Sequence, residues 1–166
     1  MRNTTKKVAL LGVLTSLALV LSYLEAMLPP ISTAAPGIKM GLPNIIIVFL
    51  LYKFGLKEAA IVSGIRVFIV ALLFGNVMTL AYSVAGALLS LVLMTILKKV
   101  NLFSIVGVSI VGGISHNLGQ ILVAIFLFDT VQIGYYMIVL AITGTIAGVV
   151  IGIIGSILVK KLEKVV

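Results

Sequence analysis

Long apolar runs separated by short clusters of basic residues are the feature that most constrains this chain. We predict a helix in each of six runs, at 8–26, 40–52, 58–74, 78–97, 102–128 and 132–159. A helix that crosses a bilayer needs about 20 predominantly apolar residues. Only 10% of the residues are charged, against roughly 25% in soluble domains, so most of the outer surface must face something apolar. The sequence therefore predicts an all-α membrane protein with a single transmembrane domain over residues 1–166.

The positions of the basic residues predict the orientation of this bundle in the cell membrane. Lys and Arg stay on the cytoplasmic side of membrane helices. Six crossings with the N-terminus inside place the following basic residues in the cytoplasm: Arg2, Lys6, Lys7, Lys53, Lys57, Lys98, Lys99, Lys160, Lys161 and Lys164. Lys39 then lies outside, with Glu25 and Asp129. The run at 40–52 is short, so five spanning helices plus a re-entrant segment is the alternative.

The connection between the first two helices is the long one, over 28–39. Pro29, Pro30 and Pro36 forbid a regular helix there, and Pro36-Gly37 is typical of a turn. Long loops in compact domains are often functional lids. We expect an extracellular loop that covers a site, with a passive linker as the alternative.

Several function classes are excluded by what the sequence lacks. The net charge of +8 comes from scattered clusters rather than one basic solvated face, so we expect no nucleic-acid partner. One His and no Cys predict no metal site of the zinc type. A single Asp and three Glu provide no paired carboxylates, and the phosphate-binding loop of ATPases is missing. We therefore expect neither an enzyme nor a cofactor.

Polar residues inside apolar helices are the candidates for ligand binding, because they are costly in a membrane. Arg66 lies in the middle of the third run, where it either balances an anionic ligand or serves the structure. In the fifth run, Ser109, Gly112, Gly113, His116 and Gln120 share one helical stripe, and Asn117 lies beside it. These groups either order a polar ligand or bond between helices. Asn44 opens the second run at a similar depth.

Small residues at a spacing of four mark the faces through which membrane helices approach each other. Gly12 and Ser16 form one such pair, and Gly144, Gly148 and Gly152 form a longer run. We expect most of these positions to pack helices within the bundle and the remainder to dock a partner.

Three segments resemble a known family. They are Pro36-Gly37-Ile38-Lys39-Met40-Gly41-Leu42-Pro43-Asn44-Ile45, Arg66-Val67 and His116-Asn117-Leu118-Gly119-Gln120. Together they resemble the Gx transporter family, often labelled heptaprenyl diphosphate synthase component I. That family is similar in turn to the S components of energy-coupling factor (ECF) importers. Pro43 departs from the alanine expected in the family pattern.

The resemblance implies a six-helix subunit that binds a vitamin or a similar micronutrient from outside. It also implies docking, through Gly12 and Ser16, onto a transmembrane coupling subunit driven by two cytoplasmic ATPases. The synthase label conflicts with the residues, because prenyl diphosphate chemistry needs clustered aspartates around magnesium and Asp129 stands alone in the sequence.

Our first hypothesis is therefore a substrate-binding membrane subunit of an energy-coupled importer for a small, vitamin-like or anionic micronutrient. The predicted ligand-binding residues are Lys39, Asn44, Arg66, His116, Asn117 and Gln120. The alternative is a non-catalytic membrane accessory subunit in isoprenoid or quinone synthesis. A free-standing secondary transporter is weaker, because the sequence places no carboxylate within the membrane.

Overall fold

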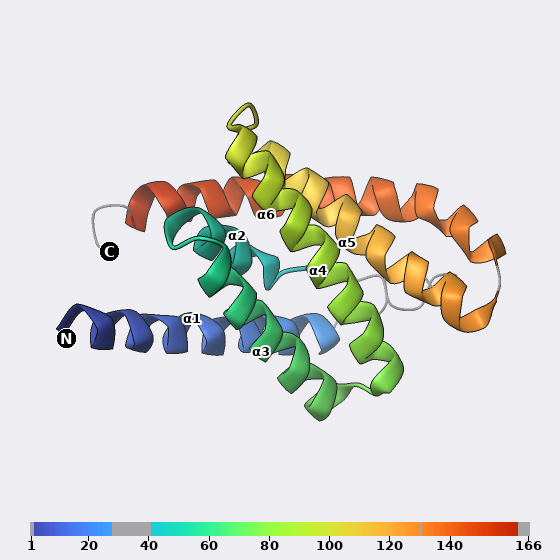
Figure 1. Ribbon diagram of the computed structural model, residues 1–166, viewed down its shortest axis with the longest axis horizontal. Coiled ribbons are helices and arrows are strands. Elements are labelled where there is room, and N and C mark those ends of the chain that lie inside the picture. The colour runs from blue at the N-terminus through green and yellow to red at the C-terminus, as the bar shows by residue number, and fades with distance from the viewer. Residues whose placement is uncertain (1, 28–40, 130, 163–166) are drawn as a thin grey trace.

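The computed structural model describes residues 2–27, 41–129 and 131–162, and all the regular structure in these ranges is helical (Figure 1). Its elements are α1 (Arg2–Met27), α2 (Asn44–Lys53), α3 (Leu56–Phe74), α4 (Val77–Val100), α5 (Ile105–Phe128), the 3₁₀ helix η1 (Val131–Tyr136) and α6 (Met137–Leu162). The expected all-helical fold is confirmed for these residues. The predicted loop at 28–39, which includes Lys39, lies outside them.

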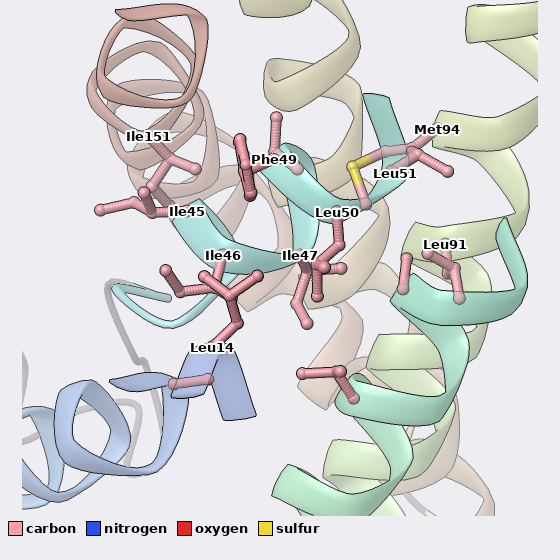
Figure 2. Packing of buried hydrophobic residues seen from close by; sticks show 14 of the residues in the cluster. Leu14, Ile45, Ile46, Ile47, Phe49, Leu50, Leu51, Leu91, Met94 and Ile151 are labelled. Atoms are coloured by element: carbon pink, nitrogen blue, oxygen red, sulfur yellow. The ribbon is translucent and has the colours of Figure 1, made fainter. Parts of the chain in front are cut away.

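Helix α2 forms the centre of the core. Its residues 45–51 are all buried. Figure 2 shows its side chains surrounded by Leu14 from α1, Leu91 and Met94 from α4, and Ile151 from α6. A helix that is apolar on all sides is buried on all sides.

The length of α2 also sets it apart from the other helices. Its 10 residues rise about 15 Å, roughly half the thickness of the hydrocarbon core of a bilayer. The helix begins at Asn44 rather than at residue 40, because Gly41 has a φ of +75° and Pro43 occupies the N-cap position. The described helix by itself is therefore too short for a full crossing of the membrane.

Glycines bring α5 and α6 into close contact. A Cβ atom at Gly148 would lie 2.5 Å from the Cα of Ile110, and one at Gly152 would lie 2.7 Å from the Cα of Val106. Gly144 packs against the backbone of Gly113 in the same way. The expectation that this small-residue run packs helices within the bundle is therefore confirmed.

Basic residues gather at one end of the bundle. Lys7 Nζ lies 2.5 Å from a carboxylate oxygen of Glu58 at the start of α3. Lys98 Nζ, near the end of α4, donates to the carbonyl of Leu51 in the last turn of α2, 2.6 Å away. The first turn of α1 and the last turn of α6 also lie at this end (Figure 1). This clustering agrees with the prediction that the basic residues between the apolar runs lie on one side of the membrane. Which side of the membrane this is remains a prediction.

Within the described ranges, four helices are long and apolar enough to cross a membrane. They are α1 from Thr4, α4, α5 and the segment Gly134–Lys161, which covers α6 except its last residue. Helix α3 has 19 residues but carries Lys57, Glu58 and Arg66. Large apolar side chains cover the outer surface, with Ile138 on α6 70% exposed and Leu72 on α3 69% exposed. Such a surface suits a lipid environment.

Candidate functional site

A small polar cavity lies in the half of the bundle away from the basic end. Its volume is about 40 Å³, which is room for a few water molecules. Five helices and the turn before α2 contribute to its wall. The lining residues are Ser22, Glu25, Gly41, Asn44, Arg66, Val67, Val70, Ser83, His116 and Gln120. Eight of these ten residues are not aliphatic, so the cavity is a polar site within an apolar bundle.

Arg66 supplies the positive charge of this cavity. It lies about 15 Å along α3 from Leu56 and about 12 Å from Phe74, in the middle of the helix. Its Nε atom is buried, and no described residue accepts a hydrogen bond from it. The carboxylate of Glu25 attracts the guanidinium electrostatically from α1. A charge at this depth is costly, so it is retained where it faces a polar cavity or a ligand.

Glu25 joins the cavity to the start of α2. It is buried, and its carboxylate accepts a hydrogen bond from the backbone N–H of Gly41. The carbonyl of Gly41 in turn accepts the N–H of Asn44 at 2.8 Å, which closes the turn that opens α2. A Cβ at Gly41 would lie 2.9 Å from Asn44 Nδ2, so the Asn44 side chain folds over this glycine. The carboxylate therefore helps to hold Asn44 at the cavity.

His116 and Gln120 form the α5 wall of the cavity. Their Nε2 atoms lie 3.0 Å apart, one helical turn from each other. This contact is a hydrogen bond between the amide and the imidazole, and which group donates depends on the histidine tautomer. The ring packs against Gly86 of α4, where an added Cβ would lie 2.9 Å from His116 Cε1. Gly86 therefore makes room for the imidazole between α4 and α5.

The structure brings four of the six predicted ligand-binding residues to this one cavity: Asn44, Arg66, His116 and Gln120. Asn117 faces the other way, because adjacent helical residues point about 100° apart. Its Nδ2 donates to the carbonyl of Leu140 on α6 at 2.8 Å, so it joins two helices and does not line the cavity. Lys39 lies outside the described residues.

Sequence reasoning missed Ser22, Glu25 and Ser83, which also line the cavity. Glu25 was predicted near the outer end of the first helix, and the structure places it in α1 with its side chain in the lining of the cavity. The reason for setting aside a secondary transporter, the lack of a carboxylate within the membrane, therefore no longer holds. The sequence did contain an indication of this role. Ser22 and Glu25 are three residues apart, so their polar side chains lie on the same face of the first helix.

The predicted docking pair lies away from this site, on the outer side of α1. Gly12 and Ser16 are both exposed, and a Cβ at Gly12 would meet no atom within 4 Å. The hydroxyl of Ser16 donates to the carbonyl of Gly12 at 3.0 Å, within the helix. The pair therefore leaves a shallow surface that a second helix could approach.

The cavity offers one imidazole and one carboxylate as charged or metal-ligating groups besides Arg66. Among the residues that the structure describes, no group of three or more His, Cys, Asp or Glu side chains could hold a metal ion. The arrangement instead provides hydrogen-bond donors and acceptors around one guanidinium and one carboxylate, which suits the recognition of a small polar group.

Comparison with known proteins identifies a family. The sequence model of a family described as heptaprenyl diphosphate synthase component I matches residues 14–158. No curated protein and no solved structure matches the chain.

Proposed function

The chain belongs to the heptaprenyl diphosphate synthase component I family, and we propose that it is the substrate-binding membrane subunit of an energy-coupled importer. The observation that carries this proposal is the guanidinium of Arg66, which faces a polar cavity in the middle of an apolar bundle. The cargo is a small solute with an anionic group. The protein itself acts by binding and presentation, without a chemical step.

The polar lining favours ligand binding over helix packing. Polar groups that only join helices pair with the nearest carbonyl, as Asn117 does with Leu140. The polar side chains at the cavity instead converge on one space from α1, α2, α3, α4 and α5. Hydrogen bonds to charged groups each contribute about 1.5–3 kcal/mol, so each such bond from this lining would stabilise an anion bound at Arg66.

Transport requires a source of energy outside this chain. The 166 residues contain no phosphate-binding loop of the ATPase type, so ATP hydrolysis would come from partner subunits. The exposed pair Gly12 and Ser16 is the proposed contact with a transmembrane coupling subunit, because small residues let membrane helices approach closely. Both termini, and the basic end with them, would then face the cytoplasm and its ATPases.

The name of the family favours a second candidate, a membrane accessory subunit for a prenyl diphosphate synthase. In this role the chain would anchor a soluble synthase at the membrane through its basic end. The two candidates differ in the protein that the chain brings with it and in whether the cavity holds a cargo.

Purification in mild detergent, followed by extraction and mass spectrometry, tests the proposal. We expect close to one small molecule per chain. Arg66→Gln and Gln120→Ala should each lower its content about tenfold or more, since each removes a hydrogen bond to a charged group. Gln132→Ala is the matched control, because Gln132 is exposed in η1, away from the cavity.

The proteins that co-purify separate the candidates. A coupling subunit with two ATPases supports the importer, and its loss in Gly12→Leu supports docking through α1. A soluble prenyl synthase bound to a chain with an empty cavity would replace the importer by the accessory role. If Gln132→Ala lowers the ligand content as much as Gln120→Ala does, the cavity is not the binding site.

A further inference from the structure

The α3 side of the polar cavity offers hydrogen-bond donors. Arg66 lines the cavity from α3, and a guanidinium carries five N–H donors and no acceptor. Its Nε atom is buried, and no described residue accepts a hydrogen bond from it. A buried donor without an acceptor costs free energy, so this position favours a ligand that presents an acceptor. The positive charge of the guanidinium makes an anionic oxygen the strongest acceptor.

The α1 side of the cavity offers acceptors. Glu25 is 8% exposed, and an ionised carboxylate only accepts hydrogen bonds, at about four lone-pair sites. The backbone N–H of Gly41 uses one of these sites, and the carboxylate has sites for further donors. Ser22, one turn earlier in α1, donates its hydroxyl proton to the carbonyl of Ala18 at 2.8 Å. Its oxygen is therefore a second acceptor at the cavity, beside the carboxylate.

The two sides of the cavity also carry opposite charges. The carboxylate of Glu25 on α1 attracts the guanidinium of Arg66 on α3. With a neutral His116 ring, the charges of the lining cancel. A buried charge is costly unless an opposite charge compensates it, so a dianion such as a phosphate would leave excess negative charge beside Glu25. A ligand group with one negative and one positive charge adds no net charge, and each of its charges meets an opposite one.

The size of the cavity limits this ligand group to a few heavy atoms. A volume of about 40 Å³ holds a few water molecules. In an α-amino acid the ammonium and the carboxylate are attached to the same carbon atom, which is a compact form of a zwitterion. A zwitterion with its charges further apart would need a longer cavity. The amides of Asn44 and Gln120, which also line the cavity, can bond to either charged group.

We infer that the cavity binds the zwitterionic head group of an α-amino acid. The ligand carboxylate binds at Arg66, and the ligand ammonium donates to Glu25 and Ser22. This inference rests on the proposed solute-binding function and names its substrate class. Glu25 is then a specificity-determining residue, which selects a zwitterion over a simple anion.

Binding to the whole protein in phosphatidylcholine nanodiscs tests the inference, with empty nanodiscs as the background. The probes are glycine, acetate and methylamine, which carry both charges, the negative charge alone and the positive charge alone. Ligand-detected NMR at millimolar probe concentrations gives their relative affinities. We expect glycine to bind at least about tenfold more tightly than either of the others, because each of those lacks a hydrogen bond to a charged group.

Glu25→Gln provides the sharper measurement. Its amide oxygen can still accept from Gly41, so the turn before α2 is kept while the charge is lost. Glycine should bind about tenfold more weakly to this variant, whereas acetate should bind as tightly as to the wild type or more tightly, which also shows that the variant folds. Arg66→Gln should weaken both glycine and acetate. Glu58→Gln is the matched control, because Glu58 pairs with Lys7 at the basic end and does not line the cavity.

Three results overturn the inference. One is glycine binding that is no tighter than acetate binding, and another is an equal loss of glycine binding in Glu25→Gln and Glu58→Gln. The third is a co-purified anion that has no amino group and is released by Arg66→Gln. In that third case the proposed importer function stands and only the zwitterion is rejected. If Arg66→Gln changes neither probe binding nor ligand content, both are rejected.

Discussion

Replacing Gly148 by alanine measures how closely α5 and α6 must approach. The new Cβ would lie 2.5 Å from the Cα of Ile110, 2.9 Å from the carbonyl oxygen of Ser109 and 3.0 Å from the N of Ile110. Ordinary contacts begin at 3.4 Å, so the closest contact is about 0.9 Å too short. All three atoms belong to the backbone and cannot rotate away. Helix α6 must therefore move outward along this stretch.

The magnitude follows from the size of that movement. Overpacking of this kind costs about 1–3 kcal/mol, and a gap of 0.5–1 Å removes a quarter to a half of each contact energy along the interface. A helix is also more stable with alanine than with glycine at an interior position, by about 0.5–1 kcal/mol, which partly offsets the loss. Gly64→Ala receives the same helix benefit without the clash, because its Cβ meets no atom within 4 Å. The difference between the two variants is therefore the strain alone, about 1–3 kcal/mol.

Reversible unfolding with sodium dodecyl sulfate in mixed micelles gives this difference. The chain has no Trp, so far-ultraviolet circular dichroism or tyrosine fluorescence follows the transition. We expect Gly148→Ala to unfold at a lower mole fraction of the denaturant than the wild type, and Gly64→Ala at an equal or higher one. Equal free energies of unfolding for the two variants would refute the close packing of α5 on α6.

Three further predictions use other parts of the bundle. Asn117→Ala removes a buried bond between α5 and α6 and should lower the free energy of unfolding by about 0.6–1.7 kcal/mol in the same assay, with ligand content unchanged in the folded fraction. Gly86→Ala should displace the His116 ring and lower ligand content more than Asn117→Ala does; a ligand content like that of the wild type would contradict the role of Gly86. Lys99→Cys should react with a membrane-impermeant maleimide only from the cytoplasmic side, and Gln132→Cys only from outside, in a chain that has no native cysteine. The opposite labelling pattern would invert the proposed topology.

The helical membrane fold was predictable because its cause is local. Apolar runs of this length have no stable alternative to a helix in lipid, where each backbone group must bond within its own segment. Most helix ends agree within a few residues with the predicted runs, although α1 begins six residues earlier than 8 and α6 five residues later than 132. The core role of α2 was not predictable, since a short apolar run has the same pattern in a buried helix and in part of a span.

The candidate site was predictable where single residues carried the signal. Arg66 stands out as a charge in an apolar run, and His116 and Gln120 stand out by sharing a helical face. The sequence does not say which neighbour each face meets, and for that reason Asn117 was grouped with the site although it bonds to α6. Glu25 was missed because its role depends on the meeting of α1 with Gly41, 16 residues further along.

By itself, then, the sequence determined that this chain forms apolar helices, that its basic residues gather at one end, and that polar groups lie in its interior. These follow from composition, helical period and the cost of charge in lipid, which act within each segment. Only the tertiary structure decided that four of the predicted residues share one cavity with Glu25. Packing brings together side chains that are far apart in the chain, and the angle at which each helix meets its neighbours depends on contacts between segments.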